Sequence, residues 1–302
     1  MNRTIALIGT GAMGSAVARR FTDQGCRVIT VLEGRSEASQ ARARAAGMQG
    51  VERTALAGAE LVLSIVPPGV ALEVAADLAP LLAAAPVRGV YVDCNAVSPA
   101  TVRTIAARIA PSGWRFADVG IVGLPPTEVE GTVFYAAGEA AARFAELART
   151  ALEVRLLDGP IGAASALKMA YAGMTKGVTA ICAAMILAAE RAGAAPALRA
   201  ELARSRPELL GVARLQMPRA FPRAWRWVAE MREIADFAGA DPATAAIYEG
   251  IAQLYERIAA DVAGPNAATR ALLDFLGEAP SGPASSDQAP PASATAARSR
   301  PA

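Results

Sequence analysis

A glycine-rich turn between a short apolar strand and an amphipathic helix constrains the fold of this chain most strongly. Residues 9–18 read GTGAMGSAVA, so Gly9, Gly11 and Gly14 form a G-x-G-x-x-G motif at the start of a helix expected over residues 13–24. The first glycine permits the tight bend, the second lets the backbone approach a pyrophosphate, and the third lets the helix pack against the strand. The helix start also favours an anion, because its amides are unpaired. The motif predicts a dinucleotide-binding βαβ unit.

The first half of the chain alternates short apolar runs with amphipathic stretches. Such alternation predicts an α/β fold of the Rossmann type, with a doubly wound parallel sheet and helices on both faces. The runs are continuously apolar, as burial on both faces of a sheet requires. We expect strands over residues 4–8, 27–32, 61–66, 89–93, 115–119, 133–137 and 154–157, and helices over residues 13–24, 36–46, 70–84 and 98–109.

The composition changes after Asp158. Residues 161–191 are nearly all Ala, Leu, Met, Ile and Thr without proline, which predicts one long buried helix joining the two domains. Further helices are expected over residues 196–275, so the carboxy-terminal domain is all-α. A length of 302 residues suggests two domains. We expect a dinucleotide-binding domain over residues 1–158, a helical substrate and dimerisation domain over 159–277, and a disordered tail rich in Ala, Ser and Pro over 278–302.

Charge and residue usage exclude several classes of function. The formal net charge is +2, which gives no electrostatic signature of nucleic-acid binding. No histidine is present, which rules out Ser-His-Asp catalysis and a His-ligated metal, and we expect no metal. The three cysteines are far apart and indicate reduced thiols in a cytoplasmic protein. The uncharged run over residues 177–189 is shorter than the roughly 18 residues that span a bilayer, so we expect a buried helix and no membrane.

The cofactor contacts are expected in the glycine turn and at the ends of the second and third strands. Thr10, Ala12 and Met13 lie in the turn with the three glycines. Glu33 follows the second strand, nineteen residues beyond Gly14, where an acidic residue binds the adenosine ribose of NAD. Arg35 and Ser36 come directly after it and can hold the 2′-phosphate of NADP. The cofactor is therefore predicted as NAD or NADP.

The third strand ends in Val66, Pro67 and Pro68. Ligands of open α/β sheets bind at the carboxyl ends of the strands. The proline pair is stiff and lacks amide donors, so it can line the pocket of the nicotinamide ribose. The alternative is that the two prolines only terminate the strand.

Lys168 is the most reactive side chain expected in the second half. It lies among small and apolar residues in the segment GPIGAASALKMAYAGMTKG, residues 159–177. A lysine in such surroundings is costly unless it reaches a cleft or a partner. General acid–base chemistry is one function for such a group. A lysine whose stem covers apolar surface is the other interpretation.

Three segments together resemble the β-hydroxyacid dehydrogenase superfamily, which includes 6-phosphogluconate dehydrogenase and 3-hydroxyisobutyrate dehydrogenase. They are GTGAMGSAVA, the DCNAVSP segment over residues 93–99, and the GxxGxxxxxK pattern that leads to Lys168. The run LKMAYAGMTKG is most similar to the branch with a DUF1932-type carboxy-terminal domain. The resemblance covers residues 4–277. It implies that Lys168 takes the proton of the substrate hydroxyl during oxidation, or donates one during reduction, while the nicotinamide carries the hydride.

The resemblance also implies where substrate binds, and this chain departs from the family there. At the position of Asn95, which precedes Ala96, the family has Ser or Thr. At the position of Val122, two residues after Gly120, the family has Ser. Asn is usual one turn after the lysine, where this chain has Tyr171 and Ala172. Sugar-phosphate enzymes carry a glutamate acid where Thr175 stands, so decarboxylation of the 6-phosphogluconate type is not expected. Asn95, Ala96, Gly120, Val122 and Thr175 are the predicted substrate-binding residues.

Tyr171 is the second predicted catalytic residue, because its phenol can replace lost hydrogen bonds or act as an acid. Packing at the domain cleft is the other interpretation of this side chain. Lys176 lies about 80° around the helix from Lys168 and is expected near the rim of the cleft. The stretch over residues 219–232 is rich in arginine and can hold a carboxylate or phosphate, or form a solvated helix face.

The sequence therefore predicts an NAD(P)-dependent dehydrogenase that acts on a CH–OH group of a small hydroxy acid or on the keto partner. An imine reductase-like enzyme using NADPH is a second hypothesis, and a dinucleotide-binding regulatory protein without turnover is a third. The partner is a small-molecule substrate. The apolar periodicity of the helical domain also predicts a homodimer.

Overall fold

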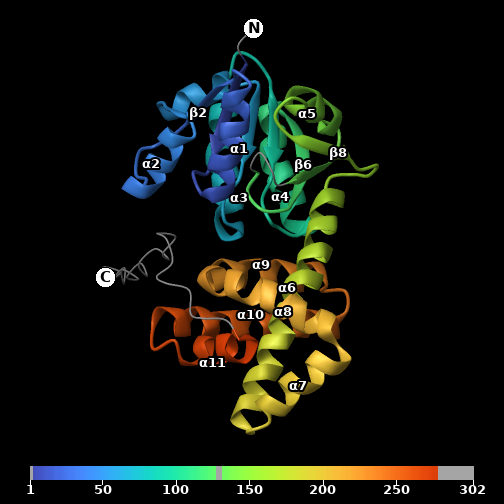
Figure 1. Cartoon of the computed structure of the whole chain (residues 1–302). Coiled ribbons are helices and arrows are strands. Elements are labelled where there is room, and N and C mark those ends of the chain that lie inside the picture. Colours follow the sequence, from blue (N-terminus) through green and yellow to red (C-terminus); the bar gives the residue numbers. More distant parts are fainter. Residues whose placement is uncertain (1–2, 127–130, 278–302) are drawn as a thin grey trace, which may run out of the picture.

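The computed structural model describes residues 3–126 and 131–277. It has two halves, a sheet with helices and an all-helical part, and the helix α6 (Ala163–Arg191) runs from one into the other (Figure 1). The predicted tail over 278–302 lies outside the described residues. The predicted domain boundary near residue 159 stays a prediction, and it falls between the last strand and α6.

One eight-stranded sheet forms the first half, in the order β3-β2-β1-β4-β5-β6-β7-β8. Six of its seven pairings are parallel, which confirms a Rossmann-type, mostly parallel sheet; β7 runs antiparallel to β6. The strands are β1 (Thr4–Ile8), β2 (Arg27–Thr30), β3 (Gln49–Gly50), β4 (Leu61–Ser64), β5 (Val90–Asp93), β6 (Arg115–Val122), β7 (Val133–Ala137) and β8 (Glu153–Leu156).

The prediction of a parallel sheet does not extend to β7, which runs antiparallel to β6. Only about ten residues separate β6 from β7, whereas a parallel crossover needs a dozen or more, usually with a helix. The chain therefore returns beside β6 in the opposite direction. β3 was not predicted from the sequence, because both residues of this strand are exposed and neither is apolar.

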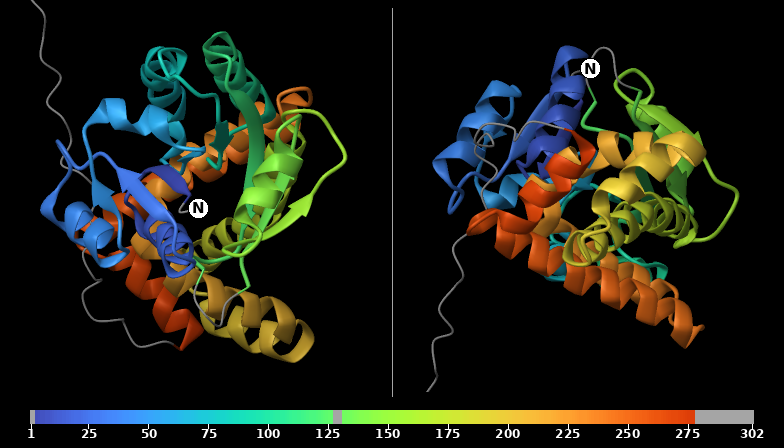
Figure 2. Two further views of the ribbon diagram at one scale, coloured as in Figure 1. Left: turned by 90° about the horizontal axis from the view of Figure 1, so that it is seen from above. Right: turned by 60° about the horizontal axis from the view of Figure 1, so that its bottom comes forward.

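Helices cover both faces of the sheet, as predicted (Figure 2). On one face, apolar residues of α1, α2 and α5 pack into one core, and on the other face those of α3 and α4 form a second core. The helices are α1 (Ala12–Asp23), α2 (Glu37–Ala45), α3 (Pro68–Ala83), α4 (Pro99–Ile109) and α5 (Ala141–Ala148).

The second half is built around α6, which confirms the predicted long helix. Buried residues of α6 form a third core with the helices that follow. These helices are α7 (Ala195–Ser205), α8 (Pro207–Ala220), α9 (Ala224–Phe237), α10 (Pro242–Ala263) and α11 (Ala267–Leu276).

The prediction of a buried segment over residues 177–189 is correct for one face of α6 only. Ala180, Ala183 and Ile186 are buried, whereas Ile181 and Met185 are more than half exposed. Among the described residues, α6 is also the one helix long and apolar enough to cross a bilayer by length and composition. Core helices pass the same test, so this is a weak indication of a membrane span.

Asp118 fixes the start of α6 against the sheet. It lies within β6 with no exposed surface, and its carboxylate accepts hydrogen bonds from the amides of Gly162 (2.8 Å), Ala164 (3.1 Å) and Ser165 (3.2 Å). The hydroxyl of Ser165 donates to its other oxygen at 2.7 Å. A carboxylate there satisfies amides that a helix start leaves unpaired. Asp118 thereby places the first turns of α6 against β6.

A second set of hydrogen bonds joins α4 to α9 across the two halves. The Ser98 amide donates to Glu233 at 2.6 Å, and the Ser98 hydroxyl donates to Asp236 at 2.7 Å. The Thr101 hydroxyl donates to the same Glu233 oxygen at 2.9 Å. Carboxylates of the helical half thus bind the start of α4, and the two halves are held together on this side.

Candidate active site

The glycine turn has the geometry that a dinucleotide-binding loop needs. Gly9 has a φ of +111°, and a Cβ there would lie 2.1 Å from the carbonyl oxygen of Ile65. A Cβ at Gly14 would lie 2.0 Å from the carbonyl oxygen of Gly9. Both positions therefore require glycine, one for the bend and the other for close packing of α1 on the loop.

Gly11 differs from its neighbours, because a Cβ there would meet nothing within 4 Å. Gly11 is the residue that caps α1, and no side chain accepts a hydrogen bond from the first turn of this helix. The surface in front of Gly11, Ala12 and Met13 is therefore open to an anion at the positive end of the helix.

The carbonyl group of Thr10 ties the loop to α2. It accepts hydrogen bonds from the hydroxyl of Ser15 at 3.3 Å and from Nε of Arg42 at 3.1 Å. Arg42 also donates to the Ser39 hydroxyl at 3.0 Å. No sequence pattern marks Arg42, because this arginine lies within an ordinary polar helix and only the fold brings it to the glycine loop.

Glu33, Arg35 and Ser36 lie together in the exposed turn between β2 and α2. The hydroxyl of Ser36 accepts a hydrogen bond from the amide of Ser39 at 3.3 Å, so it caps α2. Glu33 and Arg35 have no salt-bridge partner within 4.0 Å among the described residues. The turn therefore offers both an acid for a ribose and a cation for a 2′-phosphate.

Asn95 holds together the ends of β4 and β5. Its side-chain oxygen accepts from the amide of Val66 at 2.7 Å, and its NH₂ group donates to Asp93 at 2.8 Å and to the Ser64 hydroxyl at 3.1 Å. The residue is only 3% exposed. Both amide hydrogens are therefore engaged, and a substrate contact would have to replace one of these bonds. We propose that Asn95 fixes the loop that carries Pro67 and Pro68, where α3 begins.

Asp93 is a buried carboxyl group that sequence reasoning did not select. It is 1% exposed, and burial raises its pKa from 3.8 to about 7, while hydrogen bonds from Asn95 act in the opposite direction. A raised acid pKa means that the folded protein retains a proton that the unfolded chain has already lost. The stability of the fold therefore depends on pH at this residue.

We predict that an Asp93→Asn variant loses this pH dependence. Between about pH 4 and pH 7 the folded state binds more protons than the unfolded state, so the free energy of unfolding falls as pH rises. Between about pH 5 and pH 8 the loss from this one group is about 3 kcal/mol. Urea unfolding of both proteins at about pH 5 and pH 8 measures it. If the free energy of unfolding changed with pH by the same amount in both proteins, Asp93 would not titrate with folding.

Lys168 lies where α6 meets the sheet. A Cβ at Gly120 of β6 would lie 3.1 Å from the Cβ of Lys168 and 2.6 Å from the carbonyl oxygen of Ala164, so this close approach needs glycine. Lys168 is half-buried. Gly120 thus places the stem of Lys168 directly against β6. In the order of the sheet, β6 is the third strand from β1, which the glycine loop follows.

The other predicted residues of the site differ in their exposure and in what they contact. Val122 is half-buried near the carboxyl end of β6, and Ala96 packs against the core of the helical half. Tyr171 is 50% exposed one turn after Lys168. The hydroxyl of Thr175 donates to the carbonyl oxygen of Tyr171 at 2.9 Å, so its hydrogen bond stays within the helix.

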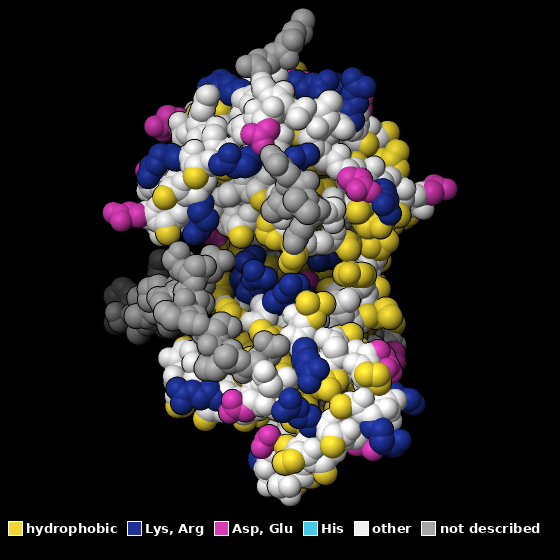
Figure 3. Space-filling model, in the orientation of Figure 1, with side chains coloured by type: hydrophobic (Ala, Val, Ile, Leu, Met, Phe, Trp, Pro, Cys, Tyr) yellow, Lys and Arg dark blue, Asp and Glu magenta, His cyan; other side chains and the backbone are white. Residues whose placement is uncertain are grey.

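The two halves enclose a hollow that is rich in cations. Figure 3 shows Lys and Arg side chains gathered between the halves, above α9. In the helical half, Lys176 of α6 forms a buried ion pair with Glu230 of α9, and the charges of Lys168 and Arg226 also act on that carboxylate. The excess of positive charge suits an anionic substrate.

Two family models match this chain. The one described as NAD binding domain of 6-phosphogluconate dehydrogenase matches residues 4–154, which is half of the chain. The chain belongs to the 6-phosphogluconate dehydrogenase-like family. A second, described as domain of unknown function (DUF1932), matches residues 189–258 within the helical half. Both findings confirm the family and the branch predicted from the motifs.

Two relatives of this family member have no established activity. A conserved protein of unknown function, described as similar in structure to 3-hydroxyacid dehydrogenases, is 30% identical, with a TM-score of 0.62 over 83% of this chain and 98% of its own. An uncharacterized 28.5 kDa protein of Methanothermus fervidus is 28% identical over 63% of this chain and 72% of its own.

More distant structures show that the fold is shared with enzymes. 3-Hydroxyisobutyrate dehydrogenase of Mycobacterium tuberculosis, solved with L-serine, has a TM-score of 0.65 at 22% identity over 86% of this chain and 95% of its own. An imine reductase variant of Myxococcus stipitatus, solved with NAD⁺, has a TM-score of 0.55 at 18% identity over 91% of this chain and all of its own. At these identities the likeness concerns the fold alone.

The glycine loop of this family member fits NAD or NADP, which confirms the predicted cofactor. The family model that covers it is an NAD binding domain. The open surface at Gly11 and the uncapped start of α1 are what a pyrophosphate requires. When bound, the nicotinamide supplies the hydride chemistry that no protein side chain can perform.

Composition carried one signal that sequence reasoning missed. Of the 30 basic residues of the chain only two are lysines, and these are Lys168 and Lys176 in α6. An arginine cannot lose its proton in a protein, whereas a lysine can. Lys168 and Lys176 are therefore the only basic side chains of the chain that can give up a proton.

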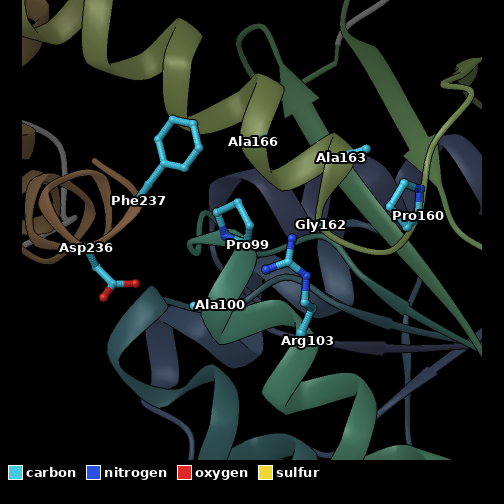
Figure 4. Close-up of a pocket in the computed structure, with 9 residues that line it drawn as sticks. All are labelled: Pro99, Ala100, Arg103, Pro160, Gly162, Ala163, Ala166, Asp236 and Phe237. Atoms are coloured by element: carbon cyan, nitrogen blue, oxygen red, sulfur yellow. The ribbon is translucent and has the colours of Figure 1, made fainter. Parts of the chain in front are cut away.

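One cavity of the described structure lies away from these residues. It measures about 390 Å³ and is bounded by the starts of α4 and α6 and by the end of α9, with Pro99, Arg103, Asp236 and Phe237 in its wall (Figure 4). None of the predicted site residues line it. No group of three or more Cys, Asp or Glu residues within the described parts of the chain has metal-binding geometry.

Proposed function

We propose that this protein is an NAD(P)-dependent dehydrogenase of a small hydroxy acid, with Lys168 as the general acid and base. The observation that carries the proposal is the contact of Lys168 with Gly120, which places a lysine against the sheet of an NAD binding domain. A positioned lysine can take the hydroxyl proton in oxidation and return it in reduction. The substrate class is also supported by 3-hydroxyisobutyrate dehydrogenase, which has the same fold.

The chain's own residues have separate tasks in this proposal. The glycine loop binds the pyrophosphate, and Pro67 and Pro68 bound the nicotinamide end. Asn95 keeps this loop in place, and Asp118 fixes the first turns of α6 so that Lys168 faces the cleft. Tyr171 provides a half-exposed phenol near the substrate. The cations of the cleft attract the carboxylate of the hydroxy acid.

A thermal-shift screen tests this function directly. A ligand that binds only the folded state raises the melting temperature. We expect NAD or NADP to raise it, and hydroxy acids to raise it further in the presence of the cofactor. Cofactor reduction by the best acids is then followed by absorbance. Cofactor binding without turnover on any acid would support the regulatory hypothesis instead.

An imine reductase remains the second candidate, because the exposed Tyr171 follows Lys168 by one turn. The same screen separates the two functions. Reduction of cyclic imines with NADPH, and no oxidation of hydroxy acids, would favour the imine reductase. A cytoplasmic location stays a prediction that rests on the three unpaired cysteines.

We also propose that the protein is a homodimer whose interface includes α6. One face of this helix carries large apolar side chains that are 40–72% exposed, and the neighbouring α8 adds two more. Apolar residues on the surface of a monomer are usually scattered singly, whereas these residues form a row along one helix. The residues are Tyr171, Met174, Val178, Ile181 and Met185, with Val212 and Leu215 of α8.

We predict that Ile181→Asp converts the dimer to a monomer, because a buried interface would have to accommodate an unpaired carboxylate. Light scattering should give twice the 30.9 kDa chain mass for the wild type and a single chain mass for the variant. Ile247→Asp is the matched control, since Ile247 is equally exposed on α10. A monomeric wild type would overturn the proposal.

A further inference from the structure

The cavity between the two halves carries two opposite charges, those of Arg103 and Asp236 (Figure 4). Its walls come from both halves, because α4 belongs to the sheet half and α9 to the helical half. A volume of about 390 Å³ is enough for a small molecule, since ligand pockets begin at about 300 Å³. A ligand in this cavity would therefore contact both halves at once.

Arg103 of α4 supplies the positive charge. Its guanidinium group lies against Gly162 at the start of α6, where an added Cβ would be 3.0 Å from Nη2 and 3.3 Å from Cζ of the arginine. Arg103 forms no salt bridge within 4.0 Å among the described residues. The start of a helix carries a partial positive charge, so a second positive charge there is unfavourable without an anion.

Asp118 is the carboxylate nearest in the fold to the start of α6, but it does not pair with Arg103. It lies within β6 without exposed surface, and it is not part of the cavity wall. Its oxygens already accept hydrogen bonds from three amides of the helix start and from the Ser165 hydroxyl. The guanidinium group is therefore available to the anionic group of a ligand.

Asp236 supplies the negative charge from the last turn of α9. One of its oxygens accepts a hydrogen bond from the Ser98 hydroxyl at 2.7 Å. No arginine or lysine of the described residues forms a salt bridge with it within 4.0 Å. The end of a helix carries a partial negative charge and favours a cation. Arg103 and Asp236 thus each lie at a helix end of their own sign, and a ligand with both charges reversed would match both ends.

The remaining wall of the cavity is apolar. Pro99 of α4, Pro160 before α6 and Phe237 of α9 line it, together with small residues. The Phe237 side chain is 39% exposed, although it is large and apolar. Burying such a side chain against a ligand is favourable. The wall therefore suits a ligand whose charged groups are attached to an apolar body.

This cavity is separate from the surface around Lys168. Ala163 and Ala166 are the residues of α6 that line it. They precede Lys168 by five and two positions, which places them roughly 140–200° around the helix from it. The cavity and the Lys168 side chain therefore lie on opposite sides of α6.

We propose that this cavity binds a small zwitterion of the amino-acid class with an apolar side chain. Its carboxylate accepts hydrogen bonds from the guanidinium group of Arg103, a geometry that can be bidentate. Its ammonium group donates to the free oxygen of Asp236, and its side chain contacts Pro99 and Phe237. The inference goes beyond the proposed function, because neither Lys168 nor the glycine loop belongs to this cavity.

Calorimetric titration of the full chain without cofactor tests the proposal. The probes are L-leucine, L-methionine and L-phenylalanine, and two analogues of phenylalanine that each lack one charge. 3-Phenylpropionate lacks the ammonium group, and phenethylamine lacks the carboxylate. We expect the amino acids to bind, and each analogue to bind at least about tenfold more weakly than L-phenylalanine. Absence of binding by all three amino acids, or equal binding of L-phenylalanine and its analogues, would overturn the proposal.

Two variants assign the charges to their partners. Arg103→Gln should weaken L-phenylalanine about tenfold and leave phenethylamine unchanged, because only the carboxylate loses its partner. Asp236→Asn keeps an acceptor for Ser98, and it should weaken L-phenylalanine but not 3-phenylpropionate. If Asp236→Asn does not fold, Arg103→Gln with both analogues carries the test. Arg108→Gln, at an exposed arginine of the same helix, is the matched control and should bind as the wild type does.

Lys168→Ala separates this site from the proposed active site. It should bind L-phenylalanine with unchanged affinity, because Lys168 lies on the other side of α6. Loss of binding in Lys168→Ala, with unchanged binding in Arg103→Gln, would place the amino acid at the proposed active site and overturn the inference. Since the titrations require no turnover, a failure of the proposed function would leave their outcome unchanged.

Discussion

Lys168→Ala is expected to lower kcat by about 10²- to 10⁴-fold, the contribution of a positioned general acid or base. The dissociation constant of NAD(P) should change little, because the glycine loop connects β1 to α1 and does not involve α6. Steady-state kinetics with the best hydroxy acid and a fluorescence titration with the cofactor measure the two quantities. The effect should therefore appear in turnover and not in cofactor binding.

Two controls make the Lys168 result specific. Arg191→Ala removes an exposed cation from the far end of the same helix and should leave kcat unchanged. A small primary amine added to Lys168→Ala should restore part of the activity, because it supplies the missing base. Undiminished turnover of Lys168→Ala on every substrate would mean that another group transfers the proton.

Gly11→Ala is expected to separate cofactor binding from folding. Its backbone is extended, and an added Cβ meets no protein atom, so the free energy of unfolding should stay constant or rise by about 0.5 kcal/mol. The same methyl group occupies the approach of the pyrophosphate. We expect the dissociation constant of NAD(P) to rise at least about tenfold, or about 1.4 kcal/mol. Urea unfolding and calorimetric titration measure the two effects.

Gly9→Ala is the comparison variant. It should lower the free energy of unfolding, whereas Gly11→Ala should lower the affinity for the cofactor. A residue with a side chain is strained at a φ of +111°, and its Cβ would collide with the backbone of Ile65. A loss of about 3 kcal/mol or more of stability is expected. If Gly11→Ala bound the cofactor as tightly as the wild type, the pyrophosphate would have to lie elsewhere.

The sequence predicted the sheet well where strands are buried on both faces. β1 and β7 begin and end at the predicted residues, because their apolar runs are bounded by polar residues or glycine. The direction of β7 could not be predicted from its residues, because a single strand has the same composition in either orientation. The fold therefore followed from hydrophobic pattern and turn chemistry, and the one reversed strand followed from a short connection.

The predicted site was more complete for the cofactor than for the substrate. A glycine motif is local, so Gly9, Gly11 and Gly14 could be identified from spacing alone. Arg42 and Glu230 act through contacts with residues far away in the sequence, and no local pattern marks them. Glu230 in particular lies 54 residues from its partner Lys176. Only the packing of α9 against α6 brings them together.

The proposed proton transfer requires that Lys168 faces the nicotinamide ring. The most direct test is a nuclear Overhauser measurement on lysine-labelled protein saturated with NAD(P), because the chain contains only two lysines. We predict a cross-peak between the ε-protons of Lys168 and the nicotinamide H4, and none for Lys176. A saturated complex in which the nicotinamide protons give no cross-peak to Lys168 would contradict the account.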